Sequence, residues 1–215
     1  MRMLRRMSAT GRGGARRPND FYETPEWCVD ALFDAEPLCG PFVDPCCGSG
    51  AILNALDRRG EAWGMDIDPE LVARAKRRGR TLFVEDYLAA KRFPGGCEDT
   101  VVMNPPYKLA AEFIRAALGD AKSGRKVAAL LRLNFLGSSR TRLDVVGPGS
   151  QLRAVHVLAR RPSFTGDGKT DACEYAWLVW EAGYRGDASI SVVLPRLPGD
   201  RNDPRAAHQP RASPA

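Results

Sequence analysis

The chain has 215 residues and a mass of 23.5 kDa, a length that suits one well-cored domain of about 100 to 200 residues. It carries 32 basic and 26 acidic residues, which give a formal net charge of +6. No run of about 18 uncharged apolar residues is present, and the Arg-rich start lacks the apolar stretch of a secretory signal. We therefore expect a soluble, cytoplasmic protein with no membrane partner.

The cysteines and histidines lack the spacing of a metal site or a disulfide framework. There is no C-x-x-C pair, and His156 and His208 are isolated in the sequence. We expect free thiols in a reducing compartment and no bound metal. The six cysteines are Cys28, Cys39, Cys46, Cys47, Cys97 and Cys173.

The excess positive charge lies in an N-terminal arm. Residues 1–19 contain six arginines and no acid, which leaves 26 basic and 26 acidic residues in the rest of the chain. Rich in Arg and Gly, the arm is expected to be disordered when free, and its charge suits a phosphate backbone or simply a solubilising tail. Residues 196–215 predict a second disordered tail, so residues 20–195 form the expected domain.

Short apolar runs alternate with helical patterns from residue 21 onward. Thr24 is suited to cap a helix that starts at Pro25, and further helices are predicted over 49–60, 69–79 and 109–120. Residues 171–180 and 189–195 predict a closing antiparallel pair. The alternation predicts an α/β fold with a mostly parallel sheet and helices on both faces. The remaining predicted strands are 41–44, 62–66, 81–86, 99–104, 126–133 and 152–159.

The first strand runs into the sequence DPCCGSG, residues 44–50, directly before a helix. Gly48 and Gly50 permit a tight turn and let a ligand approach the backbone at the helix N-terminus, although a plain glycine-lined turn is equally compatible. The segment matches neither the dinucleotide nor the nucleoside triphosphate fingerprint. Asp44 at the strand end suits a ligand that carries an amino group.

The next two strands also end in acids. Asp66 follows Asp44 by 22 residues, the offset at which an acid meets ribose hydroxyls in nucleotide-binding α/β folds, while Asp68 is suited to cap the following helix. Asp86 could accept from an adenine amino group, with Ile67 and either Tyr87 or Leu88 beside the ring, or it could cap a helix. The fourth strand ends in NPPY, residues 104–107, so these ends converge on the edge where doubly wound sheets bind ligands.

In this order and spacing, the segments ETPEW, DPCCGSG, GMDIDPE, VEDY and NPPY resemble S-adenosylmethionine-dependent methyltransferases of exocyclic amino groups, especially adenine-N6 DNA methyltransferases of the small bacteriophage type. The resemblance covers about residues 21–181 and implies a Rossmann-like class I methyltransferase sheet. Cys46 stands where many relatives have an aromatic or other apolar residue. The resemblance implies that the cofactor-binding residues are Thr24, Asp44, Pro45, Cys46, Gly48, Gly50, Asp66, Ile67 and Asp86, and that the catalytic residues are Asn104, Pro105, Pro106 and Tyr107.

The chemistry of an exocyclic amine explains the stiff NPPY corner. The lone pair of such an amine is delocalised into the ring, so the nitrogen must be drawn toward tetrahedral geometry before it attacks a methyl group. The Asn104 side-chain oxygen and the Pro105 carbonyl, fixed by Pro106, can each accept one amine hydrogen. Tyr107 can stack on the extruded base. A Pro-Pro turn that merely ends a strand is the structural alternative.

Two later loops remain to contact nucleic acid. In the loop 161–171, Phe164 either forms the second wall of the base pocket, as the resemblance suggests, or packs on the core. Arg140, Arg142 and Lys169 are the expected loop contacts. Because no separate recognition domain remains, we expect DNA adenines to be methylated in a short or degenerate sequence context.

Other functions stay open at this point. The same corner would accept cytosine-N4, an RNA base or a glutamine amide of a protein, because all of them present a planar NH₂ group. A catalytically silent nucleic-acid-binding module that retains the cofactor fold is a different class. The oligomeric state cannot be inferred from the sequence.

Overall fold

The computed structural model describes residues 23–76, 80–90, 100–137, 139–164, 170 and 172–194. The predicted arm 1–19, the tail 196–215 and Lys169 lie outside these ranges. None of the helices within them is long and apolar enough to cross a membrane.

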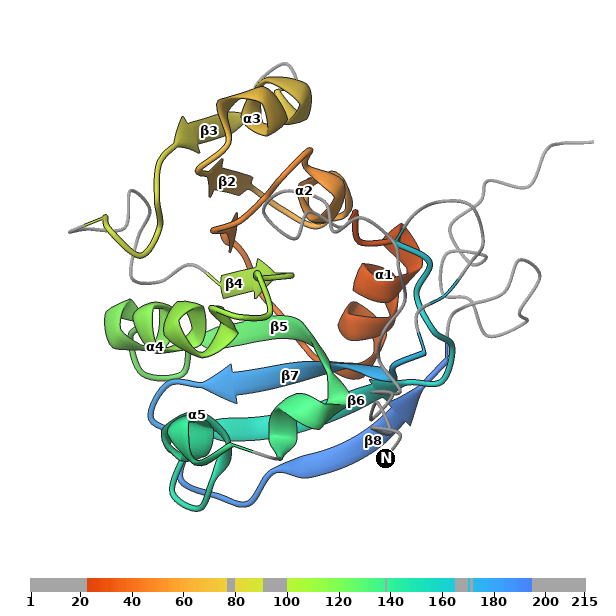
Figure 1. Cartoon of the computed structure of the whole chain (residues 1–215), viewed down its shortest axis with the longest axis vertical. Helices are drawn as coiled ribbons and strands as arrows, with labels where there is room; N and C mark the ends of the chain where they lie inside the picture. Colours follow the sequence, from red (N-terminus) through yellow and green to blue (C-terminus); the bar gives the residue numbers. More distant parts are fainter. Residues whose placement is uncertain are drawn as a thin grey trace, which may run out of the picture.

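The described residues build an eight-stranded sheet with the strand order β3-β2-β1-β4-β5-β7-β6-β8 (Figure 1). Only β7 runs against its neighbours β5 and β6; every other adjacent pair is parallel. This confirms the predicted mostly parallel α/β sheet. The strands are β1 (Phe42–Asp44), β2 (Ala62–Asp66), β3 (Thr81–Val84), β4 (Thr100–Met103), β5 (Lys126–Arg132), β6 (Leu152–Leu158), β7 (Tyr175–Glu181) and β8 (Ser189–Val193).

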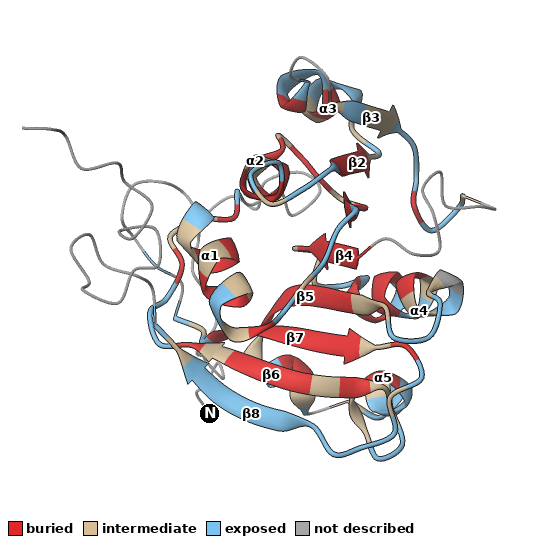
Figure 2. Ribbon diagram, turned by 180° about the vertical axis from the view of Figure 1, so that it is seen from behind, coloured by how far each residue is buried: buried red, intermediate tan, exposed pale blue. Residues whose placement is uncertain are grey.

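The predicted pairing of the last two strands is wrong. β7 inserts between β5 and β6, and β8 pairs in parallel with β6 at the sheet edge. The burial pattern explains the difference: β7 is buried along most of its length, as an interior strand must be, whereas β8 is exposed (Figure 2). Ile190 and Val192 of β8 remain 72% and 68% exposed.

Helices cover both faces of the sheet, as predicted. Residues of α1 and α2 belong to one buried apolar cluster, and residues of α4 and α5 belong to another. Trp177 and Trp180 of β7 are fully buried, one in each cluster, and their indole N–H groups donate to the carbonyl oxygens of Cys28 and Val145. The helices are α1 (Glu26–Ala35), α2 (Ala51–Leu56), α3 (Pro69–Ala75), α4 (Ala110–Asp120) and α5 (Leu143–Val146), with 3-10 turns η2 (Leu133–Leu136) and η3 (Arg140–Arg142) after β5.

Helix N-termini bear out one capping prediction and overturn another. Asp68 caps α3, since its Oδ1 accepts from the backbone N–H groups of Glu70 and Leu71. Thr24 does not cap α1, whose N-cap is Pro25 with no side-chain cap bond. The Thr24 hydroxyl instead bonds to Asn104, which follows β4.

A buried polar cluster ties the end of α1 to β5 and β6. Glu36, which is 2% exposed, accepts hydrogen bonds from Lys126 and Arg153 and bonds to His156. Burial opposes ionisation of Glu36, but the hydrogen bonds from His156 and Lys126 and the nearby positive charges lower its pKa to about 2. Because Lys126 begins β5, this cluster lies away from the carboxyl ends of the parallel strands and holds the scaffold rather than the site.

Candidate active site

The loop between β1 and α2 needs both of its predicted glycines. Gly48 and Gly50 have φ angles of 50° and 85°, in the left-handed region that disfavours residues with a side chain. A Cβ atom on Gly50 would also lie 3.1 Å from the Cβ of Ala75, so α3 packs directly on the loop. The backbone N–H of Cys47 donates to the Met65 carbonyl at 2.8 Å, which fixes the loop against β2.

Asp44 is a buried carboxylate at the end of β1. It is 1% exposed, and its Oδ1 accepts from the Cys46 backbone N–H at 3.2 Å. Burial raises the pKa of Asp44 from 3.8 to about 7; the Cys46 hydrogen bond opposes this shift, and the negative charge of Asp66 adds to it. A cationic ligand would supply the positive charge that this carboxylate needs to ionise.

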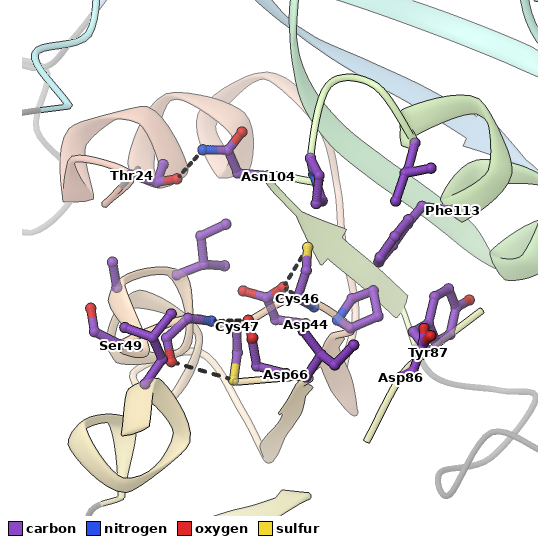
Figure 3. Close-up of a pocket in the computed structure, with 18 of the residues that line it drawn as sticks. Thr24, Asp44, Cys46, Cys47, Ser49, Asp66, Asp86, Tyr87, Asn104 and Phe113 are labelled. Carbon is purple, nitrogen blue, oxygen red and sulfur yellow. Dashed lines mark hydrogen bonds between the residues drawn. The ribbon is translucent and has the colours of Figure 1, made fainter. Parts of the chain in front are cut away.

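Asp66 joins the first loop to the end of β2. Its Oδ2 accepts from the Gly48 N–H at 2.8 Å. Its Oδ1 accepts from the Asp68 N–H at 3.0 Å. Both carboxylate oxygens therefore accept hydrogen bonds from backbone N–H groups in the ligand-free protein. The predicted ribose partner is thus also a structural tie of the loop. Figure 3 shows Asp66 in the wall of a cavity.

At the end of β3, Asp86 forms a turn of its own. Its Oδ1 accepts from the Leu88 N–H at 3.0 Å. Ile67 and Leu88 are 60% and 37% exposed, while Tyr87 is buried and its ring centroid lies 5.2 Å from that of Phe113. Exposed apolar side chains beside an acid suit a flat ring with an amino group. The shape of this region is therefore compatible with the predicted adenine site, which remains a prediction.

These strand ends surround one cavity of about 600 Å³. Its walls come from the ends of β1 to β4, from the two residues 23 and 24 that precede α1, and from the first turns of α2, α3 and α4 (Figure 3). Gly50, Pro105, Tyr107, Phe164, Arg140 and Arg142 are not among the lining residues. The predicted site residues that do line it are Thr24, Asp44, Pro45, Cys46, Gly48, Asp66, Ile67, Asp86, Asn104 and Pro106.

Asn104 stands at the border of this cavity. Its side-chain amide donates through Nδ2 to Thr24 Oγ1 at 3.1 Å, across 80 residues of sequence. Figure 3 shows the Asn104 nitrogen directed at Thr24 and the oxygen directed away from it. The bond to Thr24 therefore directs the Nδ2 end of the amide toward Thr24 and the Oδ1 end away from it.

Beyond Asn104, Tyr107 belongs to an aromatic cluster that we define as Tyr107, Arg132, Phe164 and Tyr175. The Arg132 guanidinium lies 5.1 Å from the Tyr107 ring centroid and donates through Nε to the Tyr175 hydroxyl at 3.3 Å. The rings of Tyr107 and Phe164 lie 6.2 and 5.1 Å from that of Tyr175. The structure thus brings the two predicted walls of the base pocket onto one shared ring, and Phe164 also packs on the core.

The two described loop arginines differ. Arg142 donates to the Gly137 carbonyl at 2.5 Å and its guanidinium lies 4.6 Å from the Phe135 ring centroid, so it holds its own loop together. Arg140 is exposed. The predicted contact of both with nucleic acid remains a prediction.

The sequence interpretation missed Arg132, Tyr175 and the pairing of Ser49 with Glu23. The Ser49 hydroxyl donates to Glu23 Oε1 at 2.6 Å, on the wall of the cavity. Arg132 ends β5 and Tyr175 begins the reversed β7, so both lie at the carboxyl edge of the sheet. A prediction that β7 pairs with β5 would have placed Arg132 beside Tyr175.

Comparisons with known proteins show the fold. Neither protein-family models nor curated protein sequences match this chain. A Listeria monocytogenes protein assigned to the class I S-adenosylmethionine-dependent methyltransferases superimposes with a TM-score of 0.55 at 17% identity, over 79% of this chain and 61% of its own. A modification subunit assigned to a type I restriction enzyme of Vibrio vulnificus gives 0.54 at 17%, over 84% of this chain and 48% of its own.

The 23S rRNA methyltransferase ErmE gives a TM-score of 0.54 at 15% identity, over 77% of this chain and 71% of its own. The chain therefore has the class I methyltransferase fold, and it spans about three fifths of the Listeria protein and half of the Vibrio subunit. Within the described residues, no group of three or more His, Cys, Asp or Glu side chains could hold a metal ion.

Proposed function

We propose that the protein transfers the methyl group of S-adenosylmethionine to the exocyclic N6 of adenine in DNA. One observation carries the proposal: the acidic ends of β1, β2 and β3 and the amide that follows β4 line the same cavity. A methyl donor held by the acids would lie against the Asn104 amide. In sheets of this kind, ligands bind at the carboxyl ends of the strands where the strand order reverses, which here is between β1 and β4.

The residues of the cavity fit S-adenosylmethionine by charge and by shape. The ligand carries an ammonium and a sulfonium, and the buried Asp44 carboxylate with Asp66 beside it offers the complementary negative charge. The exposed Ile67 offers a flat apolar contact for adenine. We assign Asp66 to the ribose and Asp86 to the adenine amine. Bound in this way, S-adenosylmethionine supplies an electrophilic methyl group.

The NPPY corner prepares the target amine. Asn104 Oδ1 and the Pro105 carbonyl each accept one amine hydrogen, so the lone pair points away from the ring toward the methyl group. With S-adenosylmethionine bound, formation of the nitrogen–carbon bond would break the carbon–sulfur bond, and the electron pair of that bond would stay on sulfur. The methylated nitrogen would then lose one proton to water. Neither acceptor is basic, so the side chains position the amine and do not deprotonate it.

A nucleic-acid base, rather than a protein amide, is the acceptor that the aromatic cluster favours. The rings of Tyr107 and Phe164 meet on Tyr175 just beyond Asn104, and aromatic faces hold extruded bases by stacking. One structural neighbour is a modification subunit of a restriction enzyme, which supports DNA, and another is an rRNA methyltransferase, which supports RNA as the second candidate. The arginines of residues 1–19 would add backbone contacts in either case. We expect a short or degenerate target sequence.

The test is incubation with methyl-labelled S-adenosylmethionine and DNA, RNA or protein, followed by nucleoside and amino-acid analysis. The proposal expects label in N6-methyldeoxyadenosine. Label in N4-methyldeoxycytidine, in RNA or in glutamine would keep the chemistry and overturn the acceptor. Cofactor binding without any transfer would identify a silent binding module instead.

A further inference from the structure

The hydrogen bond between Thr24 and Asn104 is the most informative contact that the motif roles leave unused. Thr24 precedes α1 and Asn104 follows β4, and both line the cavity. Thr24 is 4% exposed, so bulk water does not compete for the hydrogen bonds of its hydroxyl. Nδ2 of Asn104 donates to Thr24 Oγ1 at 3.1 Å.

A carboxamide has a donor end and an acceptor end, and only one of them suits an amine. If the Asn104 side chain turned over, its NH₂ group would face the NH₂ group of the target, donor against donor. The bond to Thr24 selects between the two orientations. When the threonine oxygen accepts from Nδ2, Oδ1 is directed away from Thr24, as Figure 3 shows.

The threonine hydroxyl can itself act in two ways, because it has one hydrogen and two lone pairs. Its behaviour toward Asn104 depends on where its hydrogen goes. If the hydrogen is donated to a ligand acceptor in the cavity, the oxygen must accept from Asn104. The strongest acceptor that S-adenosylmethionine offers is its carboxylate, and Asp44 and Asp66 disfavour a carboxylate on their side of the cavity.

We propose that Thr24 is a positioning residue that couples cofactor occupancy to the orientation of the Asn104 amide. The hydroxyl donates to the cofactor carboxylate and accepts from Nδ2, so that Oδ1 faces the target amine. The role rests on the proposed function, because it needs an amine acceptor at Asn104. This role goes beyond holding the cofactor, because Thr24 would link the bound cofactor to the amide that holds the target amine.

The test is a double-mutant cycle with Thr24→Val, Asn104→Ala and both together, measured as kcat on DNA at saturating cofactor. Thr24→Val keeps the shape and removes the hydroxyl, and kcat should fall about 10-fold or more because the amide loses its preferred orientation. In the Asn104→Ala background the same change should alter kcat less than about twofold, since the amide is gone. Thr24→Ser should restore most of the activity.

A second readout does not depend on turnover. In the wild type, S-adenosylhomocysteine should tighten the binding of adenine-containing DNA, and Thr24→Val and Asn104→Ala should each lose that tightening. Thr100→Val is the matched control: Thr100 is a buried threonine of β4 that donates to the Cys39 carbonyl at 2.5 Å, before the strand reaches the site. It should keep both kcat and the tightening.

Three results would overturn the role of Thr24. These are an unchanged kcat in Thr24→Val, effects of Thr24→Val and Asn104→Ala that multiply, or DNA tightening that survives in Thr24→Val. The first two require an active wild type, and the third requires a wild type whose DNA binding is tightened by S-adenosylhomocysteine. They are therefore distinct from failure of the proposed function, in which the wild type transfers no methyl group to DNA and both proposals fall.

Discussion

At the carboxyl ends of β1, β2 and β3, the cavity is lined by acidic side chains and loop residues that lie within a few residues of their strands. Beyond β4 lies the aromatic cluster, whose side chains come from separate segments: Tyr107, Arg132, Phe164 and Tyr175. We call the first group, to which the proposed function assigns the cofactor, the cofactor half, and the second, to which it assigns the target base, the target half.

The proposed function explains the difference by what each half would hold. A cofactor of fixed structure can be held by groups that the strand-loop-helix units supply locally, and such groups do not change when the target changes. A target base requires a pocket that can be assembled from several loops, which the scaffold positions. Asn104 lies where the two halves meet. Substitutions at Asn104, in the cofactor half and in the target half should therefore affect turnover, cofactor affinity and DNA affinity differently.

The largest effect is expected at the meeting point. Asn104→Ala removes one of two acceptors at the target amine, so kcat should fall about 100-fold or more. Cofactor affinity should stay within about twofold of the wild type, since the cofactor half is untouched. Steady-state kinetics combined with calorimetric titration checks both. A near wild-type kcat would remove NPPY from the mechanism.

Asp44→Asn should separate binding from stability within the cofactor half. Loss of the charge that the proposed function places beside the cofactor ammonium should weaken affinity by about 10- to 100-fold. The folded cofactor-free protein binds the Asp44 proton more tightly than the unfolded chain, because burial raises this pKa from 3.8 to about 7. The ionised carboxylate therefore lowers stability progressively as the pH rises from 3.8 to about 7.

Asp44→Asn should accordingly raise the free energy of unfolding of the cofactor-free protein at about pH 8, by about 1 to 4 kcal/mol. In the wild type, cofactor affinity should increase between about pH 6 and about pH 7.5, with proton release on binding. Denaturant unfolding, and calorimetry in two buffers of different ionisation enthalpy, measure these effects. A variant that is less stable than the wild type, or binding without proton release, would contradict this description of Asp44.

Asp66 should respond differently to the same kind of substitution. Asp66→Ala should weaken cofactor affinity about tenfold or more. Asp66→Asn should be no better, because both oxygens of Asp66 accept backbone N–H groups and an amide would point its NH₂ group at one of them. Calorimetric titration compares the two variants. An Asn variant that binds like the wild type would show that the tie to the loop is not needed.

The smallest effect is expected from Arg132 in the target half. Arg132→Ala should weaken DNA binding or raise KM for DNA by a few-fold, because the Tyr107 ring loses a cation–π contact of about 0.5 to 1 kcal/mol. Cofactor affinity should not change. DNA affinity measured by fluorescence anisotropy, with cofactor affinity as the control, decides whether the aromatic cluster belongs to the target half. A loss of cofactor affinity in Arg132→Ala would contradict the division of the site into two halves.

The sequence predicted that the ends of β1 to β4 lie together, because the signals for this are local. The glycines of residues 44–50, the offset between Asp44 and Asp66 and the cap at Asp68 all act within one strand-loop-helix unit. Because the parallel strand order brings the ends of these units to one edge of the sheet, nine predicted strand-end and NPPY residues line one cavity together with Thr24.

The target half was less accessible because its contacts are long-range. Nothing near Arg132 or Tyr175 indicates their contact, which depends on β7 lying beside β5. The same strand placement made the predicted closing pair wrong. Thr24 failed as a predicted cap for a related reason: a threonine before a proline has a local use in many helices, but here its hydroxyl is used across the site.

The central claim is that the cofactor half delivers a methyl group to an exocyclic amine held at Asn104. Single-turnover transfer from the preformed complex with S-adenosylmethionine tests it, on a duplex spanning a position found methylated in plasmid DNA and on a matched duplex with purine, which lacks the amine, in place of the target adenine. Methyl transfer to the adenine duplex and none to the purine position is the predicted result. Equal transfer to both duplexes, or none to either, would contradict it.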